Sequence, residues 1–150
     1  VIDCARIKDK FPDIKIIADG GIKNSGDIVK ALAAGADFAI IGSLLAGTTQ
    51  SPGEVFYKNG SKLKTYRGMA SEEAQKDWRG VASSLEGVST AIPFKGHAGD
   101  ILSNLKRGIR SGLSYSGAKS LAELRTKSQF IKQTHASQAE SNTHIYTRYK

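Results

Sequence analysis

Two short apolar stretches that each stop at glycine constrain the fold of this chain more than any other feature. The first, residues 14–18, ends at Asp19-Gly20-Gly21, and the second, residues 38–41, ends at Gly42-Ser43. Neither stretch alternates strictly between polar and apolar residues, which is typical of parallel strands covered on both faces. With a helix expected over residues 25–34 between them, the sequence predicts a strand, helix, strand unit of an α/β protein.

The turn after the first stretch has the composition of a ligand loop. Glycine allows positive φ and lets a ligand approach the main chain closely. Asn24-Ser25 then offers an N-cap for the following helix, and Gly35 suits its C-terminal end. An ordinary βα turn without a ligand remains the alternative for Asp19-Gly20-Gly21 taken alone.

The two glycine turns occupy equivalent places, because ligands of parallel α/β proteins gather at the carboxyl ends of the strands. We therefore expect a phosphosugar site. Backbone N–H groups and the Ser43 hydroxyl would bind phosphate, and Asp19 would accept hydrogen bonds from ribose hydroxyls. Purely structural glycines are the competing interpretation.

The remaining chain carries weaker local signals. Asn59-Gly60 between two apolar runs predicts a hairpin within residues 53–67. Residues 70–90 are polar, small and rich in glycine, which favours a mobile lid. Helical spacing is expected over residues 97–112, followed by a turn or loop at 111–118, and the polar tail after residue 133 is expected to be extended or disordered.

Composition narrows the class of protein. The formal net charge of +8 is uneven: residues 1–75 hold ten Lys/Arg and nine Asp/Glu, against twelve and five in the remainder. This bias suits phosphate ligands, an acidic partner or a solvated tail, whereas nucleic acid is disfavoured because no Lys/Arg cluster is interleaved with aromatics. We expect no membrane span and a cytoplasmic location, and the single cysteine, Cys4, is expected to be a packing residue.

Eight motifs, in family order, resemble the family of inosine-5′-monophosphate dehydrogenase and guanosine-5′-monophosphate reductase. The resemblance implies the C-terminal portion of a (β/α)8 TIM barrel: its last two strands, an inserted β-hairpin (53–67), a lid (70–90) and closing helices within residues 1–133, then a polar tail (134–150). The motifs are Ile17-Ala-Asp-Gly-Gly-Ile22, Ser25-Gly-Asp-Ile-Val-Lys-Ala-Leu-Ala-Ala-Gly-Ala36, Ile41-Gly-Ser43, Pro52-Gly-Glu-Val55, Tyr66-Arg-Gly-Met69, Glu86-Gly87, Ile92-Pro-Phe-Lys-Gly96 and Tyr115-Ser-Gly-Ala118.

The resemblance also implies roles for single residues. Glu86 would handle protons in catalysis, whereas the family's nucleophilic cysteine lies on an earlier loop and is not in this chain. A possible K⁺ site would use Glu140 and Ser141. The implied contacts to a purine nucleoside monophosphate are Asp19, Gly20, Gly21, Gly42, Ser43, Gly68, Met69, Ala70 and Gly87. The implied contacts to the nicotinamide dinucleotide are Met69, Ser111, Gly112, Leu113 and Ser114.

The segment between Met69 and Glu86 favours one activity. It is short and lacks the Arg-Tyr pair of the dehydrogenase flap, which indicates a GMP reductase that uses NADPH. Gly42-Ser43 and Glu140-Ser141 look more like the dehydrogenase, which oxidises IMP with NAD. A non-catalytic nucleotide-binding fragment is a third possibility. The family implies a homotetramer, and this chain alone is expected to be inactive.

Overall fold

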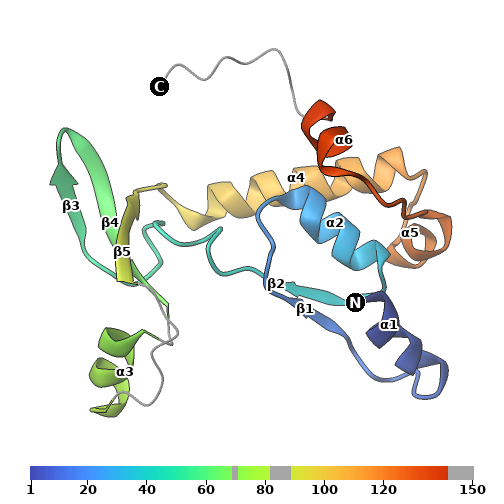
Figure 1. Ribbon diagram of the computed structural model, residues 1–150, viewed down its shortest axis with the longest axis horizontal. Coiled ribbons are helices and arrows are strands. Elements are labelled where there is room, and N and C mark those ends of the chain that lie inside the picture. Colours follow the sequence, from blue (N-terminus) through green and yellow to red (C-terminus); the bar gives the residue numbers. More distant parts are fainter. Residues whose placement is uncertain (69–70, 82–88, 142–150) are drawn as a thin grey trace.

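The computed structural model describes residues 1–68, 71–81 and 89–141 of the 150-residue chain. Its N-terminal half contains the expected α/β unit (Figure 1): strand β1 (Ile17–Asp19), helix α2 (Ser25–Ala33) and strand β2 (Phe38–Ile40). The strands are parallel, with Ile17 opposite Phe38 and Asp19 opposite Ile40. The strand, helix, strand prediction is confirmed, although both strands are shorter than the apolar stretches.

Helix α2 begins and ends where the sequence indicated. The side chain of Asn24 accepts a hydrogen bond from the Asp27 amide, as an N-cap residue does. At the other end, Gly35 has a φ of +105°, and the Ala36 amide donates to the Ala31 carbonyl. This is the pattern of a left-handed helix cap.

A short helical segment precedes β1. Helix α1 (Ile2–Ala5) continues into the 3₁₀ helix η1 (Arg6–Asp9), so the apolar spacing at the start of the chain does mark helical structure. Cys4 on α1 is exposed rather than packed, so its expected packing role is wrong for this chain.

Asp37 ties this N-terminal segment to the rest of the unit. Its carboxylate accepts hydrogen bonds from Lys8 Nζ at 2.6 Å, from the Ile16 amide at 2.8 Å and from Arg125 at 2.9 Å. The Lys8 ammonium first, and then the Ile16 amide and the Arg125 guanidinium, hold the pKa of Asp37 far below its usual range. The carboxylate therefore fixes the start of β2 from three sides.

Two further helices cover α2. Helix α4 (Ala98–Tyr115) and helix α5 (Leu121–Lys127) both pack against it, and α4 is the long helix across Figure 1. Ser120 caps α5, as expected, by accepting from the Glu123 amide. The buried core between these elements is apolar and consists of Ile22, Ile28, Leu32, Leu105, Ala118 and Leu124.

The turn or loop expected at 111–118 is wrong over most of its length, because α4 continues to Tyr115. Gly112, at the start of the expected loop, is a packing residue, and so is Gly108 within the expected helix. A Cβ on Gly112 would lie 2.6 Å from Val29 Cγ2, and one on Gly108 would lie 2.1 Å from Ser25 Oγ. Two glycines four residues apart share one helix face, so they allow α4 to approach α2 closely.

A separate antiparallel sheet follows the α/β unit. Strands β3 (Val55–Lys58) and β4 (Ser61–Arg67) form the hairpin expected at Asn59-Gly60, with Lys58 opposite Ser61. Strand β5 (Ser89–Pro93) adds to the other edge of β4, so the order is β3-β4-β5. The sequence predicts a lid that includes residues 89–90, whereas the structure places these residues in the third strand.

Helix α3 (Glu72–Arg79) occupies part of the expected lid segment. Ser71 caps it by accepting from the Ala74 amide, and Gly80 ends it with a φ of +75°. Residues 82–88 lie outside the described part of the chain, so the lid itself stays a prediction.

The β1–β2 sheet is covered on one face only. Ala18 is buried beneath the helices, but Ile17, Phe38 and Ile40 on the opposite face are 54%, 59% and 48% exposed. The expectation of two covered faces is therefore wrong for this chain by itself. Within the described residues β1 and β2 pair only with each other, so this portion of chain does not close a barrel.

The expected extended or disordered tail is wrong for its first part. Helix α6 (His135–Glu140) forms there, with the Thr134 side chain accepting from the Ser137 amide. A short polar helix has no apolar periodicity to reveal it, and its cap residue is the only local signal. None of the described helices is long and apolar enough to cross a bilayer.

Candidate functional site

The carboxyl ends of β1 and β2 bring the two glycine turns to one edge of the sheet. Asp19 ends β1 opposite Ile40, and Gly42-Ser43 follow β2 after one further residue. Gly20 and Gly21 have φ values of +88° and +74°, a conformation that side chains other than glycine rarely adopt. A Cβ on Gly20, Gly21 or Gly42 would meet no atom within 4 Å. The backbone of both turns is therefore open to a ligand.

The amide groups of these turns are available. Gly20, Gly21 and Ser43 are exposed, and the N–H groups of Gly21 and Ser43 donate no hydrogen bond to the described part of the chain. Exposed, unpaired amides at neighbouring turns are the donors that an anion such as phosphate requires. This pairing of turns agrees with the phosphosugar site that the sequence indicates.

Asp19 lies at the same edge. Its carboxylate is exposed and accepts no hydrogen bond from any described residue, so both oxygens are free for hydroxyl donors. Its side chain shares the open face of the sheet with Ile17 and, across the strand pair, Ile40. A ribose bound over this face would place its hydroxyl groups near Asp19, at the carboxyl end of β1.

Two contacts fix the shape of the turns. The Asp27 carboxylate accepts from the Lys23 amide at 3.0 Å and pairs with Lys30 at 2.9 Å, and mainly the Lys30 hydrogen bond lowers the pKa of Asp27. On the second turn, Lys95 Nζ donates to the carbonyls of Ser43 and Leu44 at 3.0 and 3.3 Å. These contacts therefore hold both turns in their observed conformations.

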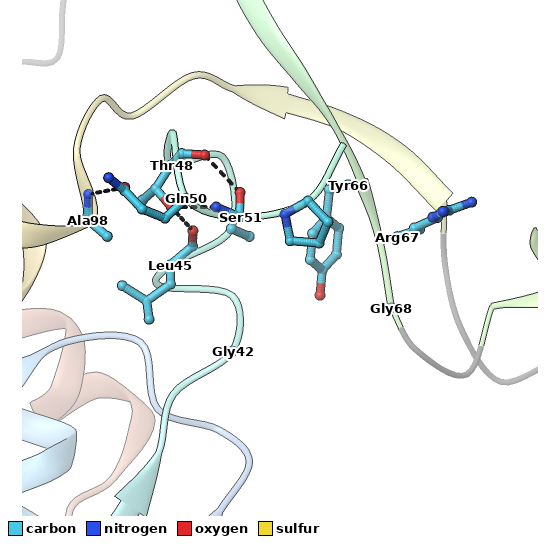
Figure 2. A pocket seen from close by; sticks show the side chains of 11 residues that line it. Gly42, Leu45, Thr48, Gln50, Ser51, Tyr66, Arg67, Gly68 and Ala98 are labelled. Atoms are coloured by element: carbon cyan, nitrogen blue, oxygen red, sulfur yellow. Dashed lines mark hydrogen bonds between the residues drawn. The ribbon is translucent and has the colours of Figure 1, made fainter. Parts of the chain in front are cut away.

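A cleft of about 460 Å³ lies beside the second turn (Figure 2). It joins Gly42 after β2 to Gly68 after β4, two residues that the sequence assigned to one nucleotide site. The walls are mostly apolar, and Tyr66 and Arg67 add polar tips. The lining residues are Gly42, Leu45, Ala46, Thr48, Gln50, Ser51, Pro52, Tyr66, Arg67, Gly68 and Ala98.

Several expected substrate contacts lie elsewhere or cannot be placed. Asp19, Gly20, Gly21 and Ser43 belong to the strand ends and do not line this cleft. Four residues lie outside the described residues: Met69, Ala70, Glu86 and Gly87.

The expected dinucleotide residues form two groups on α4. Gly112 faces Val29, and the Ser111 hydroxyl donates to the Arg107 carbonyl of its own helix. Leu113 and Ser114 line a shallower depression of about 440 Å³. That depression also carries Arg110 and Lys119, whose charges suit the phosphates of a dinucleotide.

The possible K⁺ residues lie at the end of α6. Ser141 Oγ accepts from Gln133 at 2.8 Å and donates to the Ser137 carbonyl at 2.6 Å, so its hydroxyl is already engaged. Within the described ranges, no three His, Cys, Asp or Glu side chains are grouped to hold a metal ion. A site that uses Glu140 and Ser141 therefore stays a prediction.

Sequence reasoning missed the polar residues of the cleft. Tyr66 stands two residues before Gly68, so the alternation of a strand places both on one face and could have indicated it. Thr48 and Ser51 follow no such pattern. They come from an irregular loop that closes on itself through bonds from Ser51 Oγ to the Thr48 carbonyl and from Thr48 Oγ1 to the Leu45 carbonyl.

Parallel strands with glycine turns at their carboxyl ends define an α/β protein with a candidate ligand site at the sheet edge. A family model described as the IMP dehydrogenase / GMP reductase domain matches residues 1–144, and the chain belongs to this family. The resemblance read from the sequence is confirmed.

Relatives carry both names. An inosine-5′-monophosphate dehydrogenase of Nitrosopumilus maritimus (strain SCM1) is 46% identical over 156 residues, which cover 96% of this chain and 33% of the relative. A GMP reductase of Leishmania major is 43% identical over 154 residues, covering 96% of this chain and 31% of the relative. The chain thus spans about a third of the length of the curated relatives it matches.

A solved structure shows the same fold. The crystal structure of a GMP reductase from Trypanosoma brucei in complex with guanosine 5′-monophosphate matches with a TM-score of 0.87 and 40% sequence identity. The match covers 97% of this chain and 31% of the other.

Proposed function

We propose that this chain supplies the phosphate and ribose side of a purine nucleoside monophosphate site in a longer oxidoreductase. The observation that carries the proposal is the pair of open glycine turns at the ends of β1 and β2, where the exposed amides of Gly21 and Ser43 have no acceptor in the described residues. A solved relative in complex with GMP supports the ligand class.

Each turn has its own part in binding. The amides of Gly20, Gly21, Gly42 and Ser43, with the Ser43 hydroxyl, hold the phosphate by charge-assisted hydrogen bonds. Asp19 accepts from the ribose hydroxyls. The apolar cleft wall near Gly42 and Gly68 leads from the phosphate toward the ring, where Met69, Ala70 and Gly87 are assigned as purine contacts.

The reaction is the reductive deamination of GMP to IMP. An upstream cysteine of the longer protein attacks C2 of the purine and ammonia leaves, while Glu86 handles the protons at the amide edge of the ring. The hydride that NADPH would supply is then added to C2, and the carbon–sulfur bond breaks to release IMP and the free cysteine. The support for the reductase is the short connection between Met69 and Glu86, which contains α3 and no Arg-Tyr pair to activate water.

The dinucleotide is assigned to Met69 and to Ser111, Gly112, Leu113 and Ser114. Only some of these residues are suited to binding a dinucleotide. Leu113 and Ser114 lie beside the cations Arg110 and Lys119, which suit phosphate, whereas Gly112 is occupied by packing against α2. We assign the phosphates to this depression and leave Gly112 a packing role. The homotetramer implied by the family belongs to the same proposal.

IMP dehydrogenase with NAD is the second candidate. It is favoured by the relative from Nitrosopumilus maritimus at 46% identity and by the Gly42-Ser43 turn. The same nucleotide site serves both candidates, because they share a purine monophosphate and differ in the group at C2.

The test is turnover by the full-length protein that contains this chain. It is incubated with GMP and NADPH, or with IMP and NAD, and the absorbance of reduced nicotinamide is followed. We expect oxidation of NADPH with GMP and no reduction of NAD with IMP. The opposite pattern establishes the dehydrogenase, and activity with neither pair contradicts the proposed enzyme.

A further inference from the structure

One buried lysine is not used by the nucleotide site described above. Lys64 on β4 has a relative exposure of 3%, and its Nζ points at three backbone carbonyls of the loop after β2. The distances are 2.7 Å to Thr48, 3.3 Å to Thr49 and 2.5 Å to Ser51. An ammonium group has three N–H donors, so this set satisfies all of them.

The charge of Lys64 is solvated by peptide groups alone. It forms no ion pair with any carboxylate of the described residues. A buried charge is tolerated only where hydrogen bonds replace its lost water. The ammonium therefore orients the three carbonyls. Without it the carbonyls of Thr49 and Ser51 would lose this donor, whereas the Thr48 carbonyl would keep its bonds from the Ser51 amide and hydroxyl.

The loop is tight on either side of this point. A Cβ on Gly47 would lie 2.5 Å from the Pro93 carbonyl oxygen of β5, and one on Gly53 would lie 2.1 Å from the Thr65 carbonyl oxygen of β4. Because these two residues lack a Cβ, the ends of the loop can pack closely against the antiparallel sheet. Lys64 holds the middle of the same loop, so residues 45–52 take their shape from the sheet.

That loop is the wall of the cleft. Six of its residues line the cleft, and Thr48 and Ser51 contribute both a carbonyl to Lys64 and a surface to the cleft (Figure 2). Lys64 and Tyr66 are two residues apart on β4, so they lie on one face of the strand. The cation thus stands directly behind the wall that begins at the Gly42-Ser43 turn.

We propose that Lys64 is a positioning residue, a built-in cation that fixes residues 45–52 as the wall of the nucleotide cleft. This rests on the proposed function, since it assigns the cleft to the nucleotide. Lys64 does not touch the ligand. It acts by turning the carbonyls of Thr48, Thr49 and Ser51 away from the cleft, and it places a positive charge behind a site for an anion.

The test is the affinity of the full-length protein for GMP, measured by calorimetry well below its melting temperature. Lys64→Met keeps the length of the side chain and removes the cation, and we expect GMP to bind about tenfold more weakly or worse. The matched control is Lys62→Ala on the same face of β4, where Lys62 is exposed and lies over the Phe94 ring, and it should bind GMP as the wild type does.

A second variant separates positioning from general stability. Lys64→Ala leaves a space that added propylammonium can fill, and this amine carries the same N–H donors as the lysine. The affinity of this variant for GMP should therefore return in the presence of propylammonium and fall when the amine is removed. Tetramethylammonium has no donors and should not restore it. Affinity of Lys64→Met equal to wild type, or equal affinity of Lys64→Ala with and without propylammonium, overturns the proposal. If the wild type binds neither GMP nor IMP, the proposed function is overturned instead.

Discussion

Gly112 gives the sharpest test of the packing between α2 and α4. In Gly112→Ala the new Cβ would lie 2.6 Å from Val29 Cγ2 and 2.9 Å from Val29 Cγ1. Carbon atoms prefer separations of about 3.5–4.0 Å, so the helices must part by about 1 Å. Overpacking of this kind costs about 1–3 kcal/mol, and the better helix propensity of alanine returns at most about 1 kcal/mol.

We therefore expect Gly112→Ala to lower the free energy of unfolding by about 1–2 kcal/mol. The clash is with the two Cγ atoms of Val29, so Val29→Ala should relieve it. In a double-mutant cycle followed by urea denaturation of the full-length protein, the double variant should be more stable than the sum of the singles by about 1 kcal/mol or more. Additive effects would refute the packing role of Gly112.

Three other changes test the site and its support. Asp37→Asn should cost about 1–3 kcal/mol in urea denaturation, because Lys8 and Arg125 lose their carboxylate. The pKa of Asp37 is held below its ordinary value, so wild-type stability should be complete above about pH 5 and fall as the pH drops toward that lowered pKa; a wild type and Asn variant with the same acid dependence would contradict this. Asp19→Ala should weaken GMP binding about tenfold or more, since a charged acceptor for hydroxyls is lost, and an unchanged calorimetric affinity would remove Asp19 from the site. Glu86→Gln should reduce turnover far more than nucleotide affinity, and an unchanged rate would exclude Glu86 from proton handling.

Local signals in the sequence were sufficient where a few adjacent residues decide the structure. The Asn24 cap, the Gly35 helix end and the Asn59-Gly60 hairpin all form as expected, because each depends on neighbours in the chain. The pairing of the Asp19-Gly20-Gly21 and Gly42-Ser43 turns was also predictable, since parallel strands must end at one edge.

Contacts between distant segments were not predictable in this way. Gly112 falls at the start of the expected turn or loop, but the close approach of α2 keeps it helical. Strand β5 forms because the edge of β4 accepts it. No local pattern singles out Lys64, and only the loop folded over it gives the lysine its burial. In each case tertiary packing overrides the local preference.

The most direct measurement of the central claim is a crystal structure of the full-length protein with GMP bound. The account predicts the phosphate within hydrogen-bonding distance of the Gly21 and Ser43 amides, with the ribose hydroxyls on Asp19. A nucleotide bound away from both turns, with these amides still free, would contradict it.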